Sequence, residues 1–206
     1  MVGASTGLAT GGTQTGVLHP ASQGCTGWPS FLVGWSTGKI RVPSPENPTT
    51  VAAMTHEDRL ARLNLPLPSA PAPVAVYRSV VVAQGLAYVS GHGPLCADGS
   101  WVEGRVGADL TLEQGHAAAR QTGLAILATL RAHLGSLNQV KRVVKLLGMV
   151  NATPEFQDHP KVINGCSELF AAVFGEADGI GARSAVGMGS LPGNIAVEIE
   201  GIFELA

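Results

Sequence analysis

Residues 182–205 read ARSAVGMGSLPGNIAVEIEGIFEL, and their pattern is the most informative part of the sequence for predicting the fold. Apolar and acidic side chains alternate along residues 196–205, and this period of two predicts a β-strand with one face on a core. Residues 182–190 predict a second strand, joined to the first through Leu191-Pro192-Gly193-Asn194. One face of the pair packs on helices, and the other meets water or a partner.

The chain before this stretch predicts a regular series of further elements. The clearest is a helix over residues 111–134, where apolar residues recur with a helical period, Asp109 or Thr111 can cap the start, and Gly135 suits the end. The other expected elements are a short helix at 55–63, strands at 74–84, 86–92 and 140–150, a tight turn at Gln84-Gly85, a short third strand at Trp101-Val102, and a helix that opens at Asp158-His159-Pro160 and ends at Gly175.

The order β-β-(β)-α-β-α-β-β predicts an α+β domain in which two helices cover one face of a mixed, mostly antiparallel sheet. The second face of that sheet would be left partly apolar. Hydrophobic residues make up 45% of the 206 residues and charged residues only 14%. Because a lone small domain needs a more charged surface, we expect association with a partner subunit.

The composition changes near Met54, which divides the chain into two unlike parts. Residues 1–53 are rich in Gly, Ser, Thr and Pro and carry only three charged residues, so we expect a largely disordered extension. Three interpretations stay open: a transit segment, which lacks the expected arginines, an N-terminal arm, or an upstream over-read with Met54 as the true start. Residues 54–206 form the predicted domain, in which Thr55 can cap the first helix.

Several classes of function lose support from the sequence. The net charge is −2 and no basic run is present, which disfavours nucleic-acid binding. No apolar run is long enough to span a bilayer. The sequence contains no phosphate-binding loop, no dinucleotide fingerprint, no HExxH or CxxC pattern and no GxSxG elbow. We therefore expect neither a metal nor a cofactor.

One arginine stands out in the strand over 182–190. Arg183 lies among small and apolar residues, and Ala185, Gly187 and Gly189 share its side of the strand. Small neighbours leave room beside a guanidinium, whose planar fork suits a carboxylate. The alternative is an edge arginine that pairs with a glutamate or with another subunit.

Four other positions carry weaker signals. Glu198 could hold or activate a water, although Glu200 and Glu204 share its face and the row could simply be solvated. His92 follows a strand end and could be an acid-base group or a structural histidine. Tyr77 suits core packing, and Asn164 is an unusual mid-helix residue that faces either a pocket or solvent.

The segments that surround these residues resemble the RidA/YjgF family, in a less-studied branch. The similarity rests on Gly181-Ala182-Arg183-Ser184-Ala185-Val186, Leu191-Pro192, Val197-Glu198-Ile199-Glu200 and Tyr88-Val89-Ser90-Gly91, and it spans roughly residues 60–205. The resemblance implies a chorismate-mutase-like fold assembled as a homotrimer with clefts between subunits. It also implies roles for the following residues: Arg183 as the carboxylate anchor, Glu198 as the water-positioning group, and Tyr77, Ser90, Gly91, Asn164 and Ala185 as substrate contacts, with His92 in place of the usual glutamine.

The activity that the resemblance implies is the hydrolysis of reactive enamines and imines to 2-oxo acids and ammonia, without a cofactor. Two alternatives stay open: a non-catalytic trimeric module that binds small carboxylates or proteins, and an endoribonuclease. We expect a cytoplasmic protein, or a mitochondrial one if residues 1–53 are a transit segment.

Overall fold

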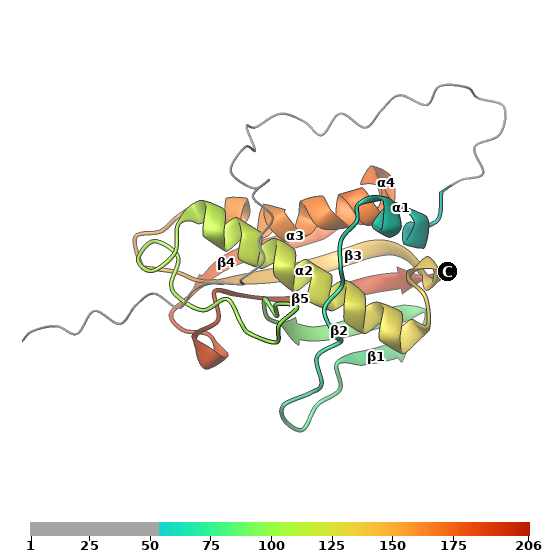
Figure 1. Cartoon of the computed structure of the whole chain (residues 1–206), viewed down its shortest axis with the longest axis horizontal. Helices are drawn as coiled ribbons and strands as arrows, with labels where there is room; N and C mark the ends of the chain where they lie inside the picture. The colour runs from blue at the N-terminus through green and yellow to red at the C-terminus, as the bar shows by residue number, and fades with distance from the viewer. Residues whose placement is uncertain (1–53) are drawn as a thin grey trace, which may run out of the picture.

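A computed structural model describes residues 54–206, which fold into a five-stranded sheet covered on one face by two long helices (Figure 1). The expectations for residues 1–53 lie outside this range. The elements in chain order are α1 (His56–Arg62), β1 (Val80–Ala83), β2 (Leu86–His92), α2 (Leu112–Leu134), η2 (Leu137–Gln139), β3 (Val140–Asn151), α3 (His159–Phe174), α4 (Glu176–Gly179), β4 (Ala182–Met188), η3 (Pro192–Asn194) and β5 (Val197–Leu205).

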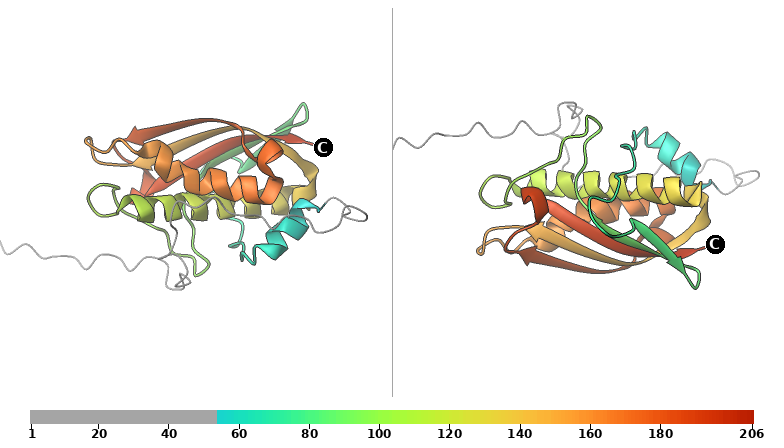
Figure 2. Two further views of the ribbon diagram at one scale, coloured as in Figure 1. Left: turned by 90° about the horizontal axis from the view of Figure 1, so that it is seen from above. Right: turned by 90° about the horizontal axis from the view of Figure 1, so that it is seen from below.

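The sheet has the strand order β1-β2-β5-β3-β4. Strands β3 and β4 are parallel and are joined by the crossover through α3, whereas the other neighbours pair antiparallel. Figure 2 shows α2 and α3 side by side on one face of the sheet, the helix face, while the other face, the open face, carries no helix. The predicted α+β class, with two helices on one face of a mixed sheet, is confirmed.

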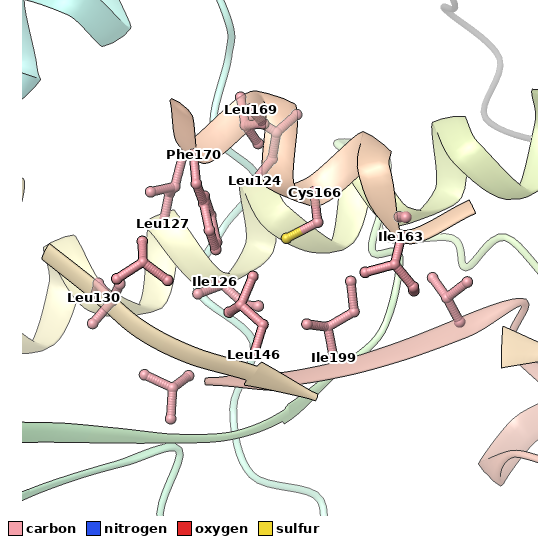
Figure 3. Packing of buried hydrophobic residues seen from close by; sticks show 14 of the residues in the cluster. Leu124, Ile126, Leu127, Leu130, Leu146, Ile163, Cys166, Leu169, Phe170 and Ile199 are labelled. Carbon is pink, nitrogen blue, oxygen red and sulfur yellow. The ribbon is translucent and has the colours of Figure 1, made fainter. Parts of the chain in front are cut away.

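The core lies between the helix face and the two helices (Figure 3). The alternation predicted for β5 is confirmed, because Val197, Ile199 and Phe203 are fully buried there. Glycine allows α2 and α3 to approach closely: a Cβ added at Gly165 would collide with the backbone carbonyl of His116. The helices therefore meet backbone to backbone at this position.

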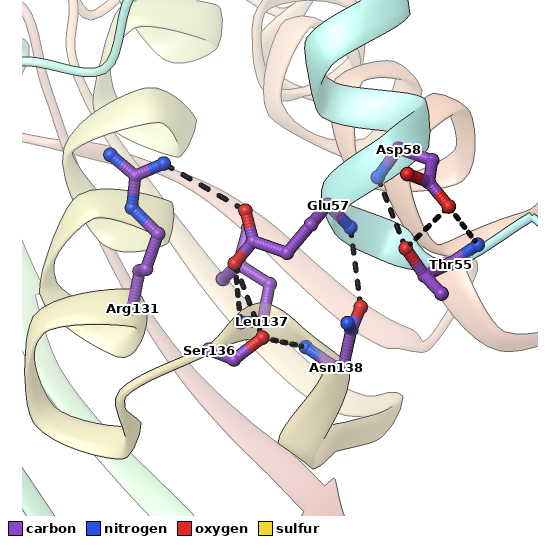
Figure 4. A network of polar contacts seen from close by, with 7 residues as sticks. All are labelled: Thr55, Glu57, Asp58, Arg131, Ser136, Leu137 and Asn138. Atoms are coloured by element: carbon purple, nitrogen blue, oxygen red, sulfur yellow. Dashed lines mark hydrogen bonds and ion pairs between the residues drawn. The ribbon is translucent and has the colours of Figure 1, made fainter.

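Local signals in the sequence mark the helix boundaries as expected. Thr55 and Thr111 form capping boxes with Asp58 and Gln114, and Gly135 ends α2 in the left-handed region at φ 81°. Helix α1 is also tied to the C-terminal end of α2: the Glu57 carboxylate accepts from the backbone N–H of Leu137 at 2.9 Å and pairs with Arg131 at 3.8 Å (Figure 4).

Two of the predicted strands are wrong in extent. Residues 74–79 are not part of β1, which begins at Val80, and Val74 and Val76 are almost fully exposed. A strand needs a partner, and the pairing with β2 extends only from Val80↔Val89 to Ala83↔Leu86. The expected third strand at Trp101-Val102 is reduced to isolated bridges, Leu95↔Trp101 and Glu103↔Ile195.

The turn that joins β1 and β2 is confirmed. Gln84 and Gly85 both have positive φ, 52° and 75°, as a two-residue hairpin turn requires. Among the helices of residues 54–206, none is long and apolar enough to cross a membrane.

Candidate functional site

Arg183 lies on the helix face of β4, at the edge of the sheet, and its guanidinium is held by α3. Nη1 donates to Oδ1 of Asn164 and to Oγ of Ser167, both at 2.9 Å, and Nη2 donates to the carbonyl of Pro160 at 3.3 Å. The three acceptors come from the first three turns of α3. The crossover connection thus fixes the orientation of the arginine by packing its helix against the strand.

The guanidinium keeps donors for a ligand. It has five N–H groups, of which three are engaged by α3. Within residues 54–206, no carboxylate lies within ion-pair distance of Arg183. The alternative of an arginine paired with a glutamate of its own chain is therefore not realised here. A half-buried cation with two N–H groups to spare is suited to a planar anion.

A groove of about 380 Å³ opens beside Arg183, between α3 and the start of β4. Its lining residues are Asn164, Ser167, Glu168, Ala171, Ile180, Gly181 and Arg183. Asn164, Ser167, Glu168 and Ala171 share one side of α3, because residues three and four apart are neighbours on a helix. The groove therefore combines one cation, one carboxylate, two neutral polar groups and a small apolar wall.

Glu198 lies on the opposite side of the sheet. Its neighbours in β5, Val197 and Ile199, point into the core, so Glu198 points to the open face. There it lies over Gly91 of β2, where an added Cβ would collide with its Oε1. Partial burial, followed by the nearby Glu200, raises the pKa of the Glu198 carboxyl. Because the sheet lies between its two faces, a single chain does not bring Arg183 and Glu198 together.

Ser90 and Gly91 belong to the neighbourhood of Glu198. The register of the β2–β5 pair shifts between Val89 and His92, and this irregularity contains both residues. Ser90 Oγ donates to the carbonyl of Arg78 at 2.7 Å, and this bond holds the segment that leads into β1. Gly91 has no side chain and so leaves space for the carboxylate of Glu198.

His92 is a core residue, with 5% of its surface exposed. Its Nδ1 lies 2.6 Å from the carbonyl of Ser90, and its Nε2 lies 2.8 Å from Oγ1 of Thr129. A carbonyl only accepts, so Nδ1 carries the proton and Nε2 accepts from Thr129 in the neutral ring. Burial lowers the pKa of His92. Of the two roles left open for His92, this geometry favours the structural one.

Tyr77 and Ala185 differ in their surroundings. Tyr77 precedes β1 and is 44% exposed, so it is not the strand residue that the sequence pattern predicted. Ala185 lies two residues beyond Arg183 on the same side of β4 and packs at the margin of the core. Beyond it, a Cβ at Gly187 would collide with the imidazole of His159 at the start of α3. The small residues of β4 thus make room for α3 as well as for a ligand.

Sequence reasoning missed three parts of the site: Ser167 and Glu168 in the groove lining, and the carbonyl of Pro160, which accepts from Arg183. A helical signal was available, since Ser167 and Glu168 follow Asn164 by three and four residues and share its face. Among residues 54–206, no group of three or more His, Cys, Asp or Glu side chains is arranged to hold a metal ion.

Comparison with known proteins agrees with this architecture. Residues 57–195 match the family model described as "YjgF/chorismate mutase-like, putative endoribonuclease". A curated relative, Protein TCP17 of Trypanosoma cruzi, is 44% identical over 146 residues, which cover 71% of this chain and 91% of the relative.

Two crystal structures extend the similarity to the fold. A protein of unknown function from Agrobacterium tumefaciens is 41% identical with a TM-score of 0.66, over 73% of this chain and 92% of that protein. A structure from Shewanella oneidensis that also carries the endoribonuclease description is 30% identical with a TM-score of 0.70, over 73% of this chain and 99% of that one. Through its sequence and its fold, the chain belongs to the YjgF/chorismate mutase-like family.

Proposed function

We propose that the protein hydrolyses reactive 2-imino acids and their enamine tautomers to 2-oxo acids and ammonia. One observation carries the proposal: the guanidinium of Arg183 is fixed by Asn164 and Ser167 at a groove, and it retains N–H groups for a carboxylate. Every 2-imino acid has a carboxylate next to the reacting carbon. Binding that carboxylate holds C2 at a fixed distance from the protein.

The hydrolysis itself needs little more than a placed water and one proton carrier. The water oxygen attacks C2 as the π electrons of the C=N bond move to nitrogen, and the proton that the water loses to a base is passed to that nitrogen, which gives a neutral carbinolamine. The carbinolamine then takes a proton on nitrogen, its hydroxyl loses one, and the C–N bond breaks to release ammonia. One acid-base group contributes about a hundredfold to ten-thousandfold to such a step.

Glu198 is the proposed base, and it requires a second copy of the chain. Within one chain it lies on the open face, whereas Arg183 lies on the helix face. Association through the open face would bury apolar side chains that are 36% to 47% exposed in the single chain: Val81, Tyr88, Val186 and Met188. We propose a homotrimer with clefts between subunits, as the family resemblance implies, and we place Glu198 of one subunit opposite Arg183 of its neighbour.

The test is a coupled assay in which an amino-acid oxidase generates imines and semicarbazide traps those that survive. The wild type should suppress semicarbazone formation, and Arg183→Ala should lose at least tenfold of this effect, because one charge-assisted contact contributes about 1.5–3 kcal/mol. Arg62→Ala is the matched control, since Arg62 is an exposed residue of α1 that donates to the sulfur of Met54 and lies outside the groove lining. If Arg183→Ala suppresses semicarbazone formation as well as the wild type does, Arg183 is not the carboxylate anchor.

A second candidate function is binding without turnover. It is favoured by the separation of Arg183 from Glu198, because a single chain then offers an anion anchor without a nearby base. Carboxylate affinity that depends on Arg183, together with no suppression of semicarbazone from any imine, would select this function. Ribonuclease activity has only the family description behind it, and the net charge of −2 gives it no electrostatic support.

A further inference from the structure

The groove beside Arg183 contains a second charged side chain, Glu168, which the proposed reaction does not use. Its carboxylate lies 3.4 Å from Nε2 of His116 on α2 and is 46% exposed. Arg120 lies one turn further along α2 and interacts with the same carboxylate. Burial lowers the pKa of Arg120, and the negative charge of Glu168 opposes this shift. Helix α2 therefore keeps Glu168 beside the groove on the side of α3 that faces α2.

Glu168 and Arg183 line the same groove without neutralising each other. No ion pair joins them, although both line a space of about 380 Å³. Nη1 of Arg183 donates instead to Asn164 and Ser167, and the Glu168 carboxylate lies beside His116 of α2. The groove thus presents a cation at one side and an anion at the other.

The remaining part of the groove lining is apolar and small. It is formed by Ala171 of α3 and by Ile180 and Gly181 ahead of β4, and Ile180 is 61% exposed. Ala171 and Ile180 offer a surface along which a short aliphatic stem can lie. Two opposite charges beside an apolar wall are complementary to a ligand with a carboxylate at one end, a methylene chain and a positive charge at the other.

We propose that Glu168 is a specificity-determining residue, which makes the groove select carboxylates that carry a cationic side chain. Resting on the proposed function, this names the substrate class as 2-imino acids with a positively charged side chain, in preference to those with an aliphatic one. Because Glu168 is nearly half exposed, its contribution is that of a surface pair, about threefold to fivefold in affinity. Salt screens such a pair, so the preference shrinks at high ionic strength.

The test measures binding of two stable 2-oxo acids to the full chain by titration calorimetry. The probes are 2-oxo-5-guanidinopentanoate, whose guanidinium stays charged, and 2-oxo-4-methylpentanoate, which is aliphatic. The wild type should bind the first about threefold to fivefold more tightly. Glu168→Gln should bind the two equally, and the matched control Glu103→Gln, which removes an exposed carboxylate outside the groove lining, should keep the preference.

The outcomes separate this inference from the proposed function. Equal affinity for both probes in the wild type, or a preference that survives in Glu168→Gln, overturns the role of Glu168 while imine hydrolysis can still stand. A preference that Glu168→Gln abolishes supports the role even if no imine is hydrolysed. If neither probe binds the wild type, the carboxylate anchor and the inference fall together.

Discussion

Asn164→Asp is a sharp test of the arginine anchor, because it changes the charge beside Arg183 and almost nothing else. Oδ1 of Asn164 accepts from Nη1 of Arg183 at 2.9 Å, and aspartate keeps the size and this contact. The variant places a carboxylate against the guanidinium, where it competes electrostatically with the carboxylate of a ligand. A hydrogen bond to a charged group contributes about 1.5–3 kcal/mol of interaction free energy where water is excluded, and the new carboxylate would strengthen the bond to Arg183 at the expense of the ligand.

The magnitude must be reduced for solvent, since Arg183 is only half-buried. We expect about 1–2 kcal/mol of lost ligand binding, which is about a fivefold to thirtyfold rise in Kd for a simple 2-oxo acid. The measurement is calorimetric titration with 2-oxobutanoate, with thermal melting to show that the fold is kept. Asn64→Asp, an equal charge change at an exposed position, is the control. Unchanged affinity in a folded Asn164→Asp protein would refute the view that Arg183 binds the carboxylate.

Two further predictions concern the core that supports the site. Burial lowers the pKa of His92 from 6.5, so as the pH falls the unfolded chain takes up a proton before the folded chain does. The free energy of unfolding should therefore decrease below about pH 6.5, by up to about 1.4 kcal/mol per pH unit. Urea unfolding at several pH values should show a shallower decrease for His92→Gln, and an equal decrease in both proteins would contradict the assignment. Gly165→Ala should lower the free energy of unfolding in urea by about 1–3 kcal/mol, despite the better helix propensity of alanine, because the added Cβ meets the carbonyl of His116. The control Gly189→Ala places its Cβ in open space and should be near neutral. Equal stabilities of the two variants would show that α2 and α3 can move apart without a loss of stability.

Several elements could be predicted from the sequence because their causes are local. Thr111 and Gln114 form a capping box within one turn, Gly135 ends the same helix with a left-handed φ, and Gln84-Gly85 adopt the positive φ values of a hairpin turn. The alternation of β5 is also local, since it follows from the pleat of one strand. The same period assigned Arg183 and Ala185 to one side of β4.

Other features depended on contacts between distant residues. Val74 and Val76 are β-branched, yet they lie outside any strand because β2 offers them no backbone partner. Tyr77 was predicted to lie in the same strand, and it lies outside β1 for the same reason. Propensity describes what a residue tolerates, and hydrogen-bonded pairing with another strand decides what it adopts.

The class of fold, the ends of the long helices, the hairpin turn and the candidates Arg183, Glu198 and Asn164 could all be predicted from the sequence. Their grouping became visible in the folded chain, where Arg183 lies with Asn164, Ser167 and Glu168 on the helix face and Glu198 lies with Gly91 on the open face. The physical reason is that periodicity tells which residues of one strand share a side, whereas the packing of α3 on β4 and the placement of β5 in the sheet determine which sides meet.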